Sequence, residues 1–410
     1  MDIRSGLLLL AALLASAPVA ADQAASTPHQ PALQLHGFGT LGVARSDDDS
    51  VEYVRDMSQQ GGLAQGWSGK VDTLLGVQAN LSLSPSMEGV VQAVSRYRFD
   101  GSYRPELTWA YLRHEVSPDF SWRLGRLGTE FFMLGDTRLV GYSNLTVRPP
   151  PEYYGSLVFS YIDGVDASLT QPLAGGLLRG KLYAGTSPEK TSFGNGIVWD
   201  LGGSLLLGGY ADYLSGPWQI RLSHAQVRFE NEMPIDDWLR AAGDPLNGIP
   251  YYNLVPGMEI ARRWARFSSL GVVYDEGPLQ LQLMLNQIKH DSPAYTDSWA
   301  GYAIAAYKMG NVAPYLGFSR VVAKADTLPS SPIPGIDDLT RFMVAQSHND
   351  QHTVFLGARW DVKENLALKA QIDWINGKPT SLFTFRNPRD PILGWDGHMT
   401  VFSLALDFVF

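Results

Sequence analysis

Apolar and polar residues alternate with a period of two along most of this chain. In the segment 400–410, one set of alternate positions is almost wholly apolar and consists of Thr400, Phe402, Leu404, Leu406, Phe408 and Phe410. The intervening positions are mixed. Because a β-strand directs alternate side chains to opposite faces, this pattern predicts a strand with one apolar face. The segments 279–286, 353–360 and 366–374 alternate in the same way, which predicts an all-β fold.

The connections between the predicted strands are alternately short and long. Short turn signals occur near Ser84–Met87, Ser117–Asp119, Pro172–Gly176, Ser215–Pro217, Glu276–Pro278, Met309–Asn311 and Lys363–Asn365. Longer stretches lie between them at 46–70, 101–105, 128–161, 186–202, 230–262, 291–297, 322–349 and 376–397. Seven turns and eight loops make fifteen connections, and therefore sixteen strands. A soluble sandwich has no reason to keep its long loops on one side, whereas a transmembrane antiparallel β-barrel has short turns at one end and longer external loops at the other.

The length of the chain agrees with such a barrel. Sixteen strands of about ten residues use roughly 160 positions and leave the rest for loops and turns. A closed barrel has no free edge, so each backbone polar group in the bilayer finds a partner. About sixteen strands enclose a water-filled lumen. We therefore predict one barrel over residues 33–410, although the pattern of Leu107 to Arg113 does not decide which side chains face inward.

The N-terminal residues have the pattern of a secretory signal peptide. A short charged start precedes an apolar core from Leu7 to Ala15, and small residues follow up to Ala21. The apolar core is too short to span a membrane, so we expect cleavage after Ala21. Residues 22–32 are rich in Ser, Thr, Pro and Gln, which predicts a flexible leader before the barrel.

Composition and charge exclude several other classes of protein. The chain is 45% hydrophobic and 11% aromatic, which is too apolar for a disordered protein. Its formal net charge of -9 argues against nucleic-acid binding, which usually needs a basic surface. Cysteine is absent, so disulfides, thiol catalysis and cysteine-bound metals are excluded.

No catalytic or metal-binding motif accompanies the barrel pattern. No histidine neighbours a Gly-x-Ser-x-Gly nucleophile elbow, and no nucleotide-binding loop occurs. His348 and His352 are four residues apart, but they lack the glutamate of a zinc-binding helix. We therefore expect no catalytic residue, no metal and no cofactor.

Short motifs resemble those of Gram-negative general-diffusion porins. Residues 35–42, Leu-His-Gly-Phe-Gly-Thr-Leu-Gly, resemble the first porin strand, and residues 124–128, Leu-Gly-Arg-Leu-Gly, resemble the strand before the constriction loop. Residues 367–371 resemble the penultimate strand, and the chain ends in Phe410 behind Phe408. The resemblance covers residues 33–410 and implies a sixteen-stranded outer-membrane porin. It also implies that Phe408 and Phe410 form the C-terminal signal for the barrel-assembly machinery.

The resemblance further implies that the third external loop folds into the barrel and narrows it. Its counterpart here is the segment 128–161, in which three prolines, Pro149 to Pro151, would stiffen the return leg because proline fixes φ. The candidate residues of this constriction loop are Glu130, Asp136, Arg138, Arg148, Glu152, Tyr153 and Tyr154. The alternative is a loop that lies outside as a lid.

Porins commonly oppose a basic wall to an acidic constriction loop. If Val91 and Ala93 face outward on the strand 90–99, then Arg96 and Arg98 face inward. Arg123 or Arg126 is a further candidate, together with Arg359 and Lys369. We assign Arg96, Arg98, Arg126, Arg359 and Lys369 to the basic wall of the pore, with solvated charges near the rim as the alternative for Arg96 and Arg98.

These patterns lead to one preferred function and two alternatives. We expect a porin in the cell outer membrane that passes small hydrophilic solutes and ions by passive diffusion. The resemblance implies a homotrimer. We also expect outer-membrane lipid and lipopolysaccharide as neighbours of the barrel. A channel specific for sugars or small anions is the first alternative. A closed barrel that binds a partner through its long fifth and seventh loops is the second.

Overall fold

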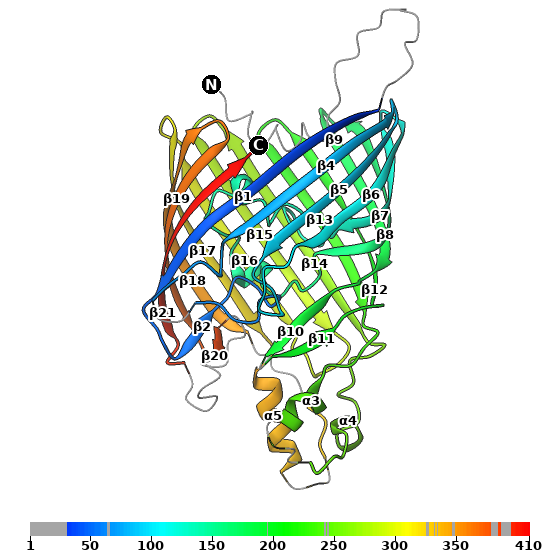
Figure 1. Cartoon of the computed structure of the whole chain (residues 1–410), viewed down its shortest axis with the longest axis vertical. Helices are drawn as coiled ribbons and strands as arrows, with labels where there is room; N and C mark the ends of the chain where they lie inside the picture. Colours follow the sequence, from blue (N-terminus) through cyan, green and yellow to red (C-terminus); the bar gives the residue numbers. More distant parts are fainter. Residues whose placement is uncertain are drawn as a thin grey trace, which may run out of the picture.

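Sixteen long strands close into one antiparallel barrel (Figure 1). The structure is a computed structural model that describes residues 31–63, 66–194, 196–241, 243, 246–324, 328–331, 333, 335–346, 349–378, 384–386 and 395–410. Neighbouring strands follow the order of the chain, and the last strand pairs with the first through Phe38↔Val409 to Arg45↔Phe402. The predicted fold, an all-β barrel of about sixteen strands, is therefore confirmed.

The long strands are separated by short strands and helices in the external loops. The barrel strands are β1 (Ala32–Ser46), β4 (Leu74–Ser84), β5 (Met87–Arg96), β6 (Glu106–Ser117), β7 (Phe120–Gly128), β8 (Tyr161–Leu173), β9 (Gly176–Thr186), β12 (Leu205–Ser215), β13 (Trp218–Arg228), β14 (Trp264–Glu276), β15 (Leu279–His290), β16 (Ser298–Tyr307), β17 (Val312–Ala323), β18 (Asp350–Lys363), β19 (Leu366–Gly377) and β21 (His398–Val409). The short strands are β2 (Val51–Tyr53), β3 (Gly66–Ser68), β10 (Lys190–Gly194), β11 (Ile197–Asp200) and β20 (Thr384–Arg386). The helices are η1 (Gly141–Ser143), α2 (Pro151–Tyr154), α3 (Ile235–Ala241), α4 (Tyr251–Leu254) and α5 (Ile336–Gln346).

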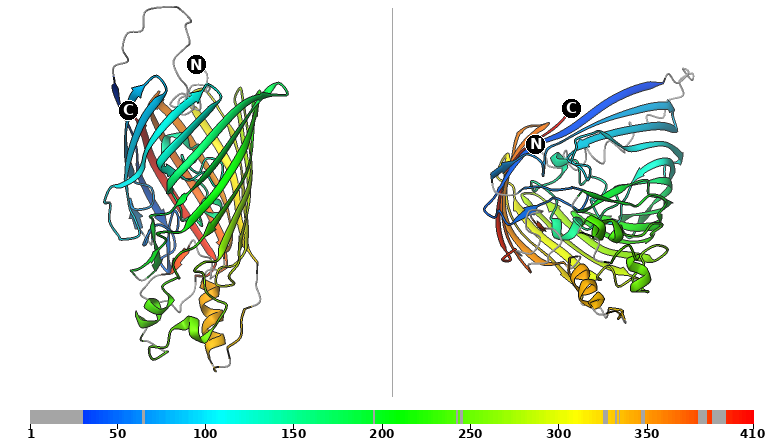
Figure 2. Two further views of the ribbon diagram at one scale, coloured as in Figure 1. Left: turned by 90° about the vertical axis from the view of Figure 1, so that its right-hand side faces the viewer. Right: turned by 60° about the horizontal axis from the view of Figure 1, so that its bottom comes forward.

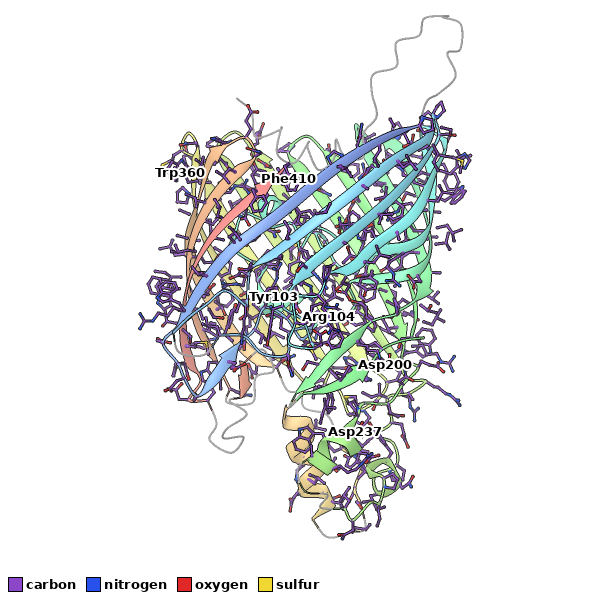
Figure 3. The ribbon with its side chains drawn as sticks, viewed as in Figure 1. Tyr103, Arg104, Asp200, Asp237, Trp360 and Phe410 are labelled. Carbon is purple, nitrogen blue, oxygen red and sulfur yellow. The ribbon has the colours of Figure 1, made fainter. Side chains whose placement is uncertain are left out.

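Short turns and long loops lie at opposite ends of the barrel. Each of the seven predicted turns joins two paired strands, as between β4 and β5, where only two residues separate the strands. The last residue, Phe410, lies at the short-turn end of the barrel, and Trp360 lies at the same end (Figure 3). At the other end, α3, α4 and α5 extend beyond the barrel over one side of its rim (Figure 2). Within the described residues, no helix is long and apolar enough to cross a membrane.

The outer face of the barrel is apolar, as the alternation predicts. Its exposed side chains include Leu35, Leu41, Leu75, Val77, Leu182, Leu222, Leu283, Leu316, Leu356, Phe402 and Leu404. On β1, Gly37 and Gly39 leave room for the rings of Phe410 and Phe408, because a Cβ atom there would lie 2.1–2.4 Å from ring carbons. An apolar band around a closed sheet suits a bilayer, where hydrocarbon contacts the side chains and no strand edge is left unpaired.

The inner face is largely packed rather than open. One core cluster joins inward residues of the strands, such as Phe267 and Met284, to residues of the loop after β7, such as Phe131 and Tyr153. The cluster continues into the external helices, where the Tyr251 hydroxyl donates a hydrogen bond to Thr340 Oγ1 at 3.0 Å. The loops are therefore part of the same core as the barrel wall.

The structure settles the side-chain phase of β6 that the sequence leaves open. Leu107 is exposed and Tyr111 is buried, and the register with β5 shifts between Gln92 and Ala93. A bulge of this kind reverses the facing of the residues on one side of it, so simple alternation does not continue through the strand. The predicted signal peptide, residues 1–21, and most of the predicted leader lie outside the described residues.

Candidate functional site: the loop inside the barrel

The segment 129–160 leaves β7, crosses the inside of the barrel and returns to β8. It includes η1 and α2, and most of its residues are buried although they belong to no barrel strand. The segment contacts the wall on several sides, which fixes its position across the lumen. We call it the inner loop.

The first leg of the inner loop is held by an ion-pair network. Glu130 forms ion pairs with Lys181 of β9, with Arg221 of β13 (3.6 Å) and with Arg123 of β7 (3.4 Å). Burial of this carboxyl group opposes ionisation, but the three cations outweigh it and lower the pKa of Glu130 to about 2. Glu130 therefore remains charged at neutral pH and draws the loop toward β7, β9 and β13.

Aromatic contacts follow the ion pairs. The rings of Phe131 and Phe132 lie 5.0 and 6.3 Å from the ring of Phe267 on β14. Met133 approaches the backbone of Gly271, where a Cβ atom would lie 2.6 Å from the methionine sulfur. Further along, the Tyr154 ring packs 6.1 Å from that of Tyr302 on β16. These contacts hold the first leg and α2 of the inner loop against β14 and β16.

Arg148 connects the return leg to three strands or strand ends on the opposite wall. It is 2% exposed and donates two hydrogen bonds to Asp72, which precedes β4, at 2.8 and 2.6 Å. It also donates to Asp373 of β19 at 3.1 Å and to Ser403 of β21. A planar guanidinium group matches carboxylates bidentately, so this arrangement fixes orientation as well as charge.

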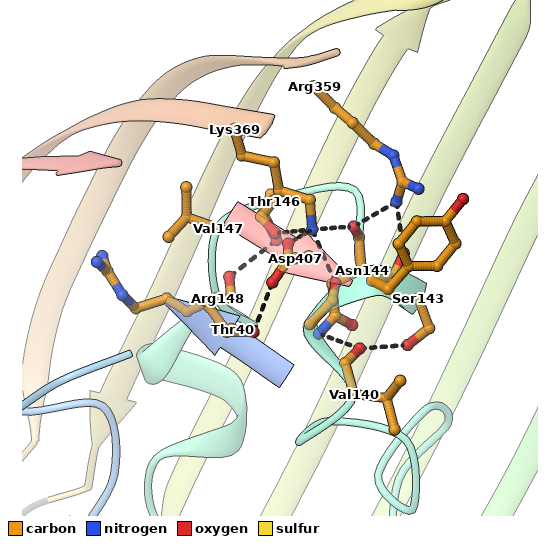
Figure 4. Close-up of polar contacts among 12 residues, drawn as sticks. Thr40, Val140, Ser143, Asn144, Thr146, Val147, Arg148, Arg359, Lys369 and Asp407 are labelled. Atoms are coloured by element: carbon orange, nitrogen blue, oxygen red, sulfur yellow. Dashed lines mark hydrogen bonds and ion pairs between the residues drawn. The ribbon is translucent and has the colours of Figure 1, made fainter. Parts of the chain in front are cut away.

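Lys369 and Arg359 bind backbone carbonyl groups of the inner loop (Figure 4). Lys369 Nζ lies 2.8 Å from Asp407 Oδ2 and donates to the carbonyl oxygens of Gly141 (2.8 Å) and Thr146 (3.1 Å). Arg359 donates to the carbonyl oxygen of Asn144 at 3.0 Å. Both cations face inward, where they bind the inner loop.

Glu152 on α2 connects the loop to β17 and β18. It is 1% exposed and accepts hydrogen bonds from Ser319 (2.6 Å), Gln351 (2.7 Å) and Thr353 (2.5 Å). Three donors from two strands stabilise the buried charge. Together with Arg148 and Lys369, this contact covers the inner wall from β17 round to β4.

The first external loop also enters the barrel and lies against the inner loop. Arg55 Nη2 donates to the carbonyl oxygen of Arg138 at 2.5 Å, and the Met57 N–H donates to that of Gly155 at 3.1 Å. Arg96 of β5 donates to Ser58 at 2.7 Å and lies 3.8 Å from Asp56. Two segments, rather than one, therefore cross the lumen.

The structure distributes the five residues predicted for the basic wall over different environments. Arg96, Arg359 and Lys369 face inward, whereas Arg98 lies beyond the end of β5 and pairs with Glu106 at 2.7 Å. The assignment of Arg126 is corrected: its guanidinium pairs with Asp163 at 2.7 Å on the outer face, beside the exposed Leu124. Leu127, one position further on, is buried in the core, so Arg126 and Arg123 face opposite sides of the sheet.

The predicted residues of the constriction loop lie close together inside the barrel, and the sequence missed their partners. Those partners are Asp72, Lys181, Arg221, Ser319, Thr353, Asp373 and Asp407. Apart from Asp72, which precedes β4, each of these partners occupies an inward position of a strand, so alternation could have placed it on the inner face. Nothing in the sequence indicated which of them meets the loop. Arg138 donates to Ser160 Oγ at 2.6 Å and so joins the two legs.

Partly exposed polar side chains remain on the inner face of β4 to β9. We call these residues, with the facing part of the inner loop, the polar lane: Gln78, Glu88, Arg123, Asp136, Thr137 and Lys181. The inward residues of β16 to β21 at the level of the loop are buried, for example Ile304 and Gln371. Within the described residues, no group of three or more His, Asp or Glu side chains forms a metal site, and His348 lies outside them.

Glu189 holds the end of the inner loop. Its carboxylate accepts hydrogen bonds from the backbone N–H groups of Ser160 (2.7 Å) and Tyr161 (3.2 Å). Burial, together with repulsion from Glu106, raises the pKa of Glu189 to about 7, although the two N–H donors and Arg138 oppose the rise. This carboxyl group therefore changes its protonation near neutral pH.

We expect Glu189→Gln to reduce the pH dependence of stability between about pH 5 and pH 8. The unfolded carboxyl group titrates near 4.3. In this range the folded protein retains a proton that the unfolded chain loses, so the stabilising contribution declines as pH rises through about 7. Glutamine keeps the acceptor oxygen but has no proton to lose. Thermal unfolding in detergent at about pH 5 and pH 8 measures this change. The control is Glu230→Gln, which replaces an exposed glutamate. An unchanged pH dependence in Glu189→Gln contradicts the prediction.

Comparison with known proteins supports the fold. No protein-family model matches the chain, and no curated protein matches it. Among solved structures, an anion-selective porin from Comamonas acidovorans is 15% identical with a TM-score of 0.55, covering 93% of this chain and 100% of that one. OmpT of Vibrio cholerae is 12% identical at a TM-score of 0.54, with 93% and 100% coverage. OmpF of Salmonella typhi, solved with daunomycin, is 11% identical at 0.52, with 92% and 97% coverage.

At these identities the likeness concerns the fold. The chain has the closed sixteen-stranded barrel fold of the solved porin structures, so the fold that the resemblance implies is confirmed.

Proposed function

We propose that this protein is an outer-membrane channel through which small hydrophilic solutes and ions diffuse passively. The observation that supports it most directly is a sixteen-stranded barrel with an apolar outer face and a charged loop fixed across its lumen. The inner loop sets the width of the passage, and the polar lane sets its charge. Export by the N-terminal signal peptide, assembly through Phe408 and Phe410, and a homotrimeric state belong to the same proposal.

The packed interior points to a narrow channel. The inner loop and residues 55–59 of the first external loop both lie across the lumen, and Met57 and Arg96 are buried where they meet. A narrow polar passage discriminates by charge more strongly than a wide one. We therefore propose selective diffusion of small ions rather than wide, general permeation.

Lys181→Gln is expected to shift the channel toward cation preference. Lys181 pairs with Glu130 and lies 3.9 Å from Asp166, and its removal increases the negative field in the polar lane. Reversal potential under a salt gradient measures the shift, and the effect should weaken at high salt. Lys363→Gln, which removes the same charge at the exposed end of β18, is the matched control. If both variants have the same reversal potential as the unmodified protein, the permeating ions do not pass Lys181 in the polar lane.

The same packed interior also fits a second function, a closed barrel that displays a binding surface. Helices α3, α4 and α5 form a packed external unit through residues such as Tyr251 and Ile336. Absence of conductance from correctly folded protein favours this alternative over the channel.

A further inference from the structure

The strands β10 and β11 form a hairpin that stands apart from the barrel wall. They pair with each other, for example through Thr191↔Trp199, and in the described part of the chain they form a sheet of their own. The hairpin arises between β9 and β12 and lies at the loop end of the barrel (Figure 1). We call residues 187–194 and 196–204 the external hairpin. Neither the inner loop nor the polar lane includes it.

One face of the external hairpin is exposed and the other is buried. Lys190 and Asp200 form an ion pair at 3.4 Å, and both side chains are exposed. Thr191 and Trp199, the next pair along the two strands, are almost completely buried. Val198 precedes Trp199 and is exposed, as the alternation of a strand requires. The buried face therefore lies against the contents of the barrel, and the exposed face lies toward solvent.

The buried face makes contacts on several sides of the barrel. Thr191 Oγ1 donates to the carbonyl oxygen of Met57 in the first external loop at 2.9 Å. The indole ring of Trp199 stacks 5.3 Å from the ring of Phe229, which follows β13, and 6.4 Å from that of Tyr295, which precedes β16. A segment that begins between β9 and β12 thus reaches the first external loop and the residues next to β13 and β16. The external hairpin therefore lies across the external mouth of the barrel.

This position leaves one polar group of the hairpin without a partner. Trp199 is 2% exposed, yet within the described residues no acceptor lies at hydrogen-bonding distance from its Nε1. A buried N–H group without an acceptor loses the hydrogen bonds that water would provide, so it disfavours this position. The stacked rings around the indole favour the same position. Opposing contributions of this kind suit an element that moves between two positions.

The external hairpin is joined to the barrel by a narrow base. The Ser187 N–H donates to the carbonyl oxygen of Ser204 at 2.9 Å, and the Gly203 N–H donates to that of Ser187 at 2.8 Å. Gly203 has a φ of +80°, a conformation that glycine adopts without strain, and Gly202 precedes it. Backbone rotation at these two glycines would therefore tilt the hairpin without breaking a barrel strand.

We propose that the external hairpin is a hinged gate over the external mouth of the channel. In the closed position its buried face packs against the first external loop and the aromatic rings next to β13 and β16. Opening tilts the hairpin about Gly202 and Gly203, exposes the Trp199 indole to water and admits solutes to the polar lane. The gate rests on the proposed channel function, because it controls entry to the same lumen.

Chemical labelling detects the movement without a conductance measurement. The chain has no cysteine, so Thr191→Cys introduces a single thiol on the buried face. A water-soluble maleimide reacts with this thiol only while the hairpin is open. We expect Trp199→Ala to raise the labelling rate about 10-fold, because it removes the stacked contacts. Val198→Ala, on the exposed face of the same strand, is the matched control and should leave the rate unchanged.

A second substitution at the same position separates gating from a simple loss of packing. Trp199→Phe keeps a stacked ring and removes the unpaired N–H group, so we expect slower labelling than with tryptophan in place. Equal rates in all variants, or faster labelling with both phenylalanine and alanine at position 199, overturn the proposal.

A reversible cross-link tests whether the movement controls conduction. Met57→Cys and Thr191→Cys, joined by a short bis-methanethiosulfonate reagent, hold the external hairpin on the first external loop. We expect single-channel openings to be lost on cross-linking and to return when a reductant cleaves the link, whereas neither single-cysteine variant should lose its openings. Openings that persist in fully cross-linked protein overturn the gate and leave the channel intact. Folded protein that conducts neither before cross-linking nor with Trp199→Ala contradicts the channel itself, and the gate with it.

Discussion

Replacement of Arg148 by methionine is expected to free the return leg of the inner loop and to increase conductance several-fold. Arg148 is 2% exposed, and its guanidinium group forms ion pairs with both Asp72 and Asp373. Without it, two carboxylates remain buried without their cation, which costs about 3–5 kcal/mol for such a group. The strands keep their backbone pairing, so the loop rather than the barrel gives way. Single-channel recording measures the wider passage.

The control variant also replaces one arginine by methionine, but at a position outside the lumen. Arg45→Met removes an exposed outward arginine from β1 and should leave conductance unchanged. Limited proteolysis from the loop end should cut the Arg148→Met protein within residues 129–160 and spare the control. A conductance equal to that of the unmodified protein, with the loop resistant to protease, contradicts the role given to Arg148.

Lys369→Met is expected to have a comparable effect on the part of the inner loop from Gly141 to Thr146, whose carbonyl groups Lys369 binds. Its ammonium group is fully buried, lies 2.8 Å from Asp407 Oδ2 and donates to carbonyl oxygens of the loop (Figure 4). Removal of the cation leaves the buried Asp407 without its ion pair; among the described residues, Thr40 Oγ1 still donates to Asp407 Oδ1 at 2.5 Å. We expect a loss of about 3–5 kcal/mol in thermal or denaturant unfolding, together with larger and noisier channel openings.

The double variant Lys369→Met with Asp407→Asn separates the charge from the packing. Because neutral partners do not leave an uncompensated charge, the double variant should recover much of the stability that the single variant loses. The carbonyl oxygens of Gly141 and Thr146 still lack their donor, so conductance should stay above that of the unmodified protein. A double variant no more stable than Lys369→Met would show that the ion pair with Asp407 is not the main contribution.

The strands and turns could be predicted because their signals are local. A turn such as Glu276–Pro278 is recognised by its Gly and Pro residues. Alternation over the neighbouring residues then shows which side chains share a face. The residues 400–410 show this directly: Phe402 and Leu404 are exposed outward, and Ser403 and Asp407 are buried inward.

The contents of the lumen could not be predicted in the same way. A polar inner face was expected, yet Phe267, Met284 and Ile304 face inward because the inner loop covers them with its own aromatic residues. The same effect explains the error at Arg126. Leu124 and Leu127 are both apolar and face opposite sides, so only the packing of Leu127 against the loop reveals that Arg126 is outward.

The charged residues of the inner loop pair with residues that lie far away in the sequence. Arg148 meets Asp373 across 225 positions, and Glu152 meets Thr353 across 201. Such pairs follow from the closed path of the strands around the barrel, which no local pattern encodes. The role of Gly271 could not be predicted from the sequence either, because the glycine is needed only where Met133 of the inner loop packs against the backbone of β14.

Single-channel conductance of the refolded protein in a planar bilayer, under a salt gradient, tests the central claim most directly. We expect discrete conductance steps that are small for a sixteen-stranded barrel and that increase in Arg148→Met. Heat-dependent mobility in electrophoresis confirms that each sample is a folded barrel before recording. Absence of conductance from folded protein, both unmodified and with Arg148→Met, would contradict a channel narrowed by the inner loop.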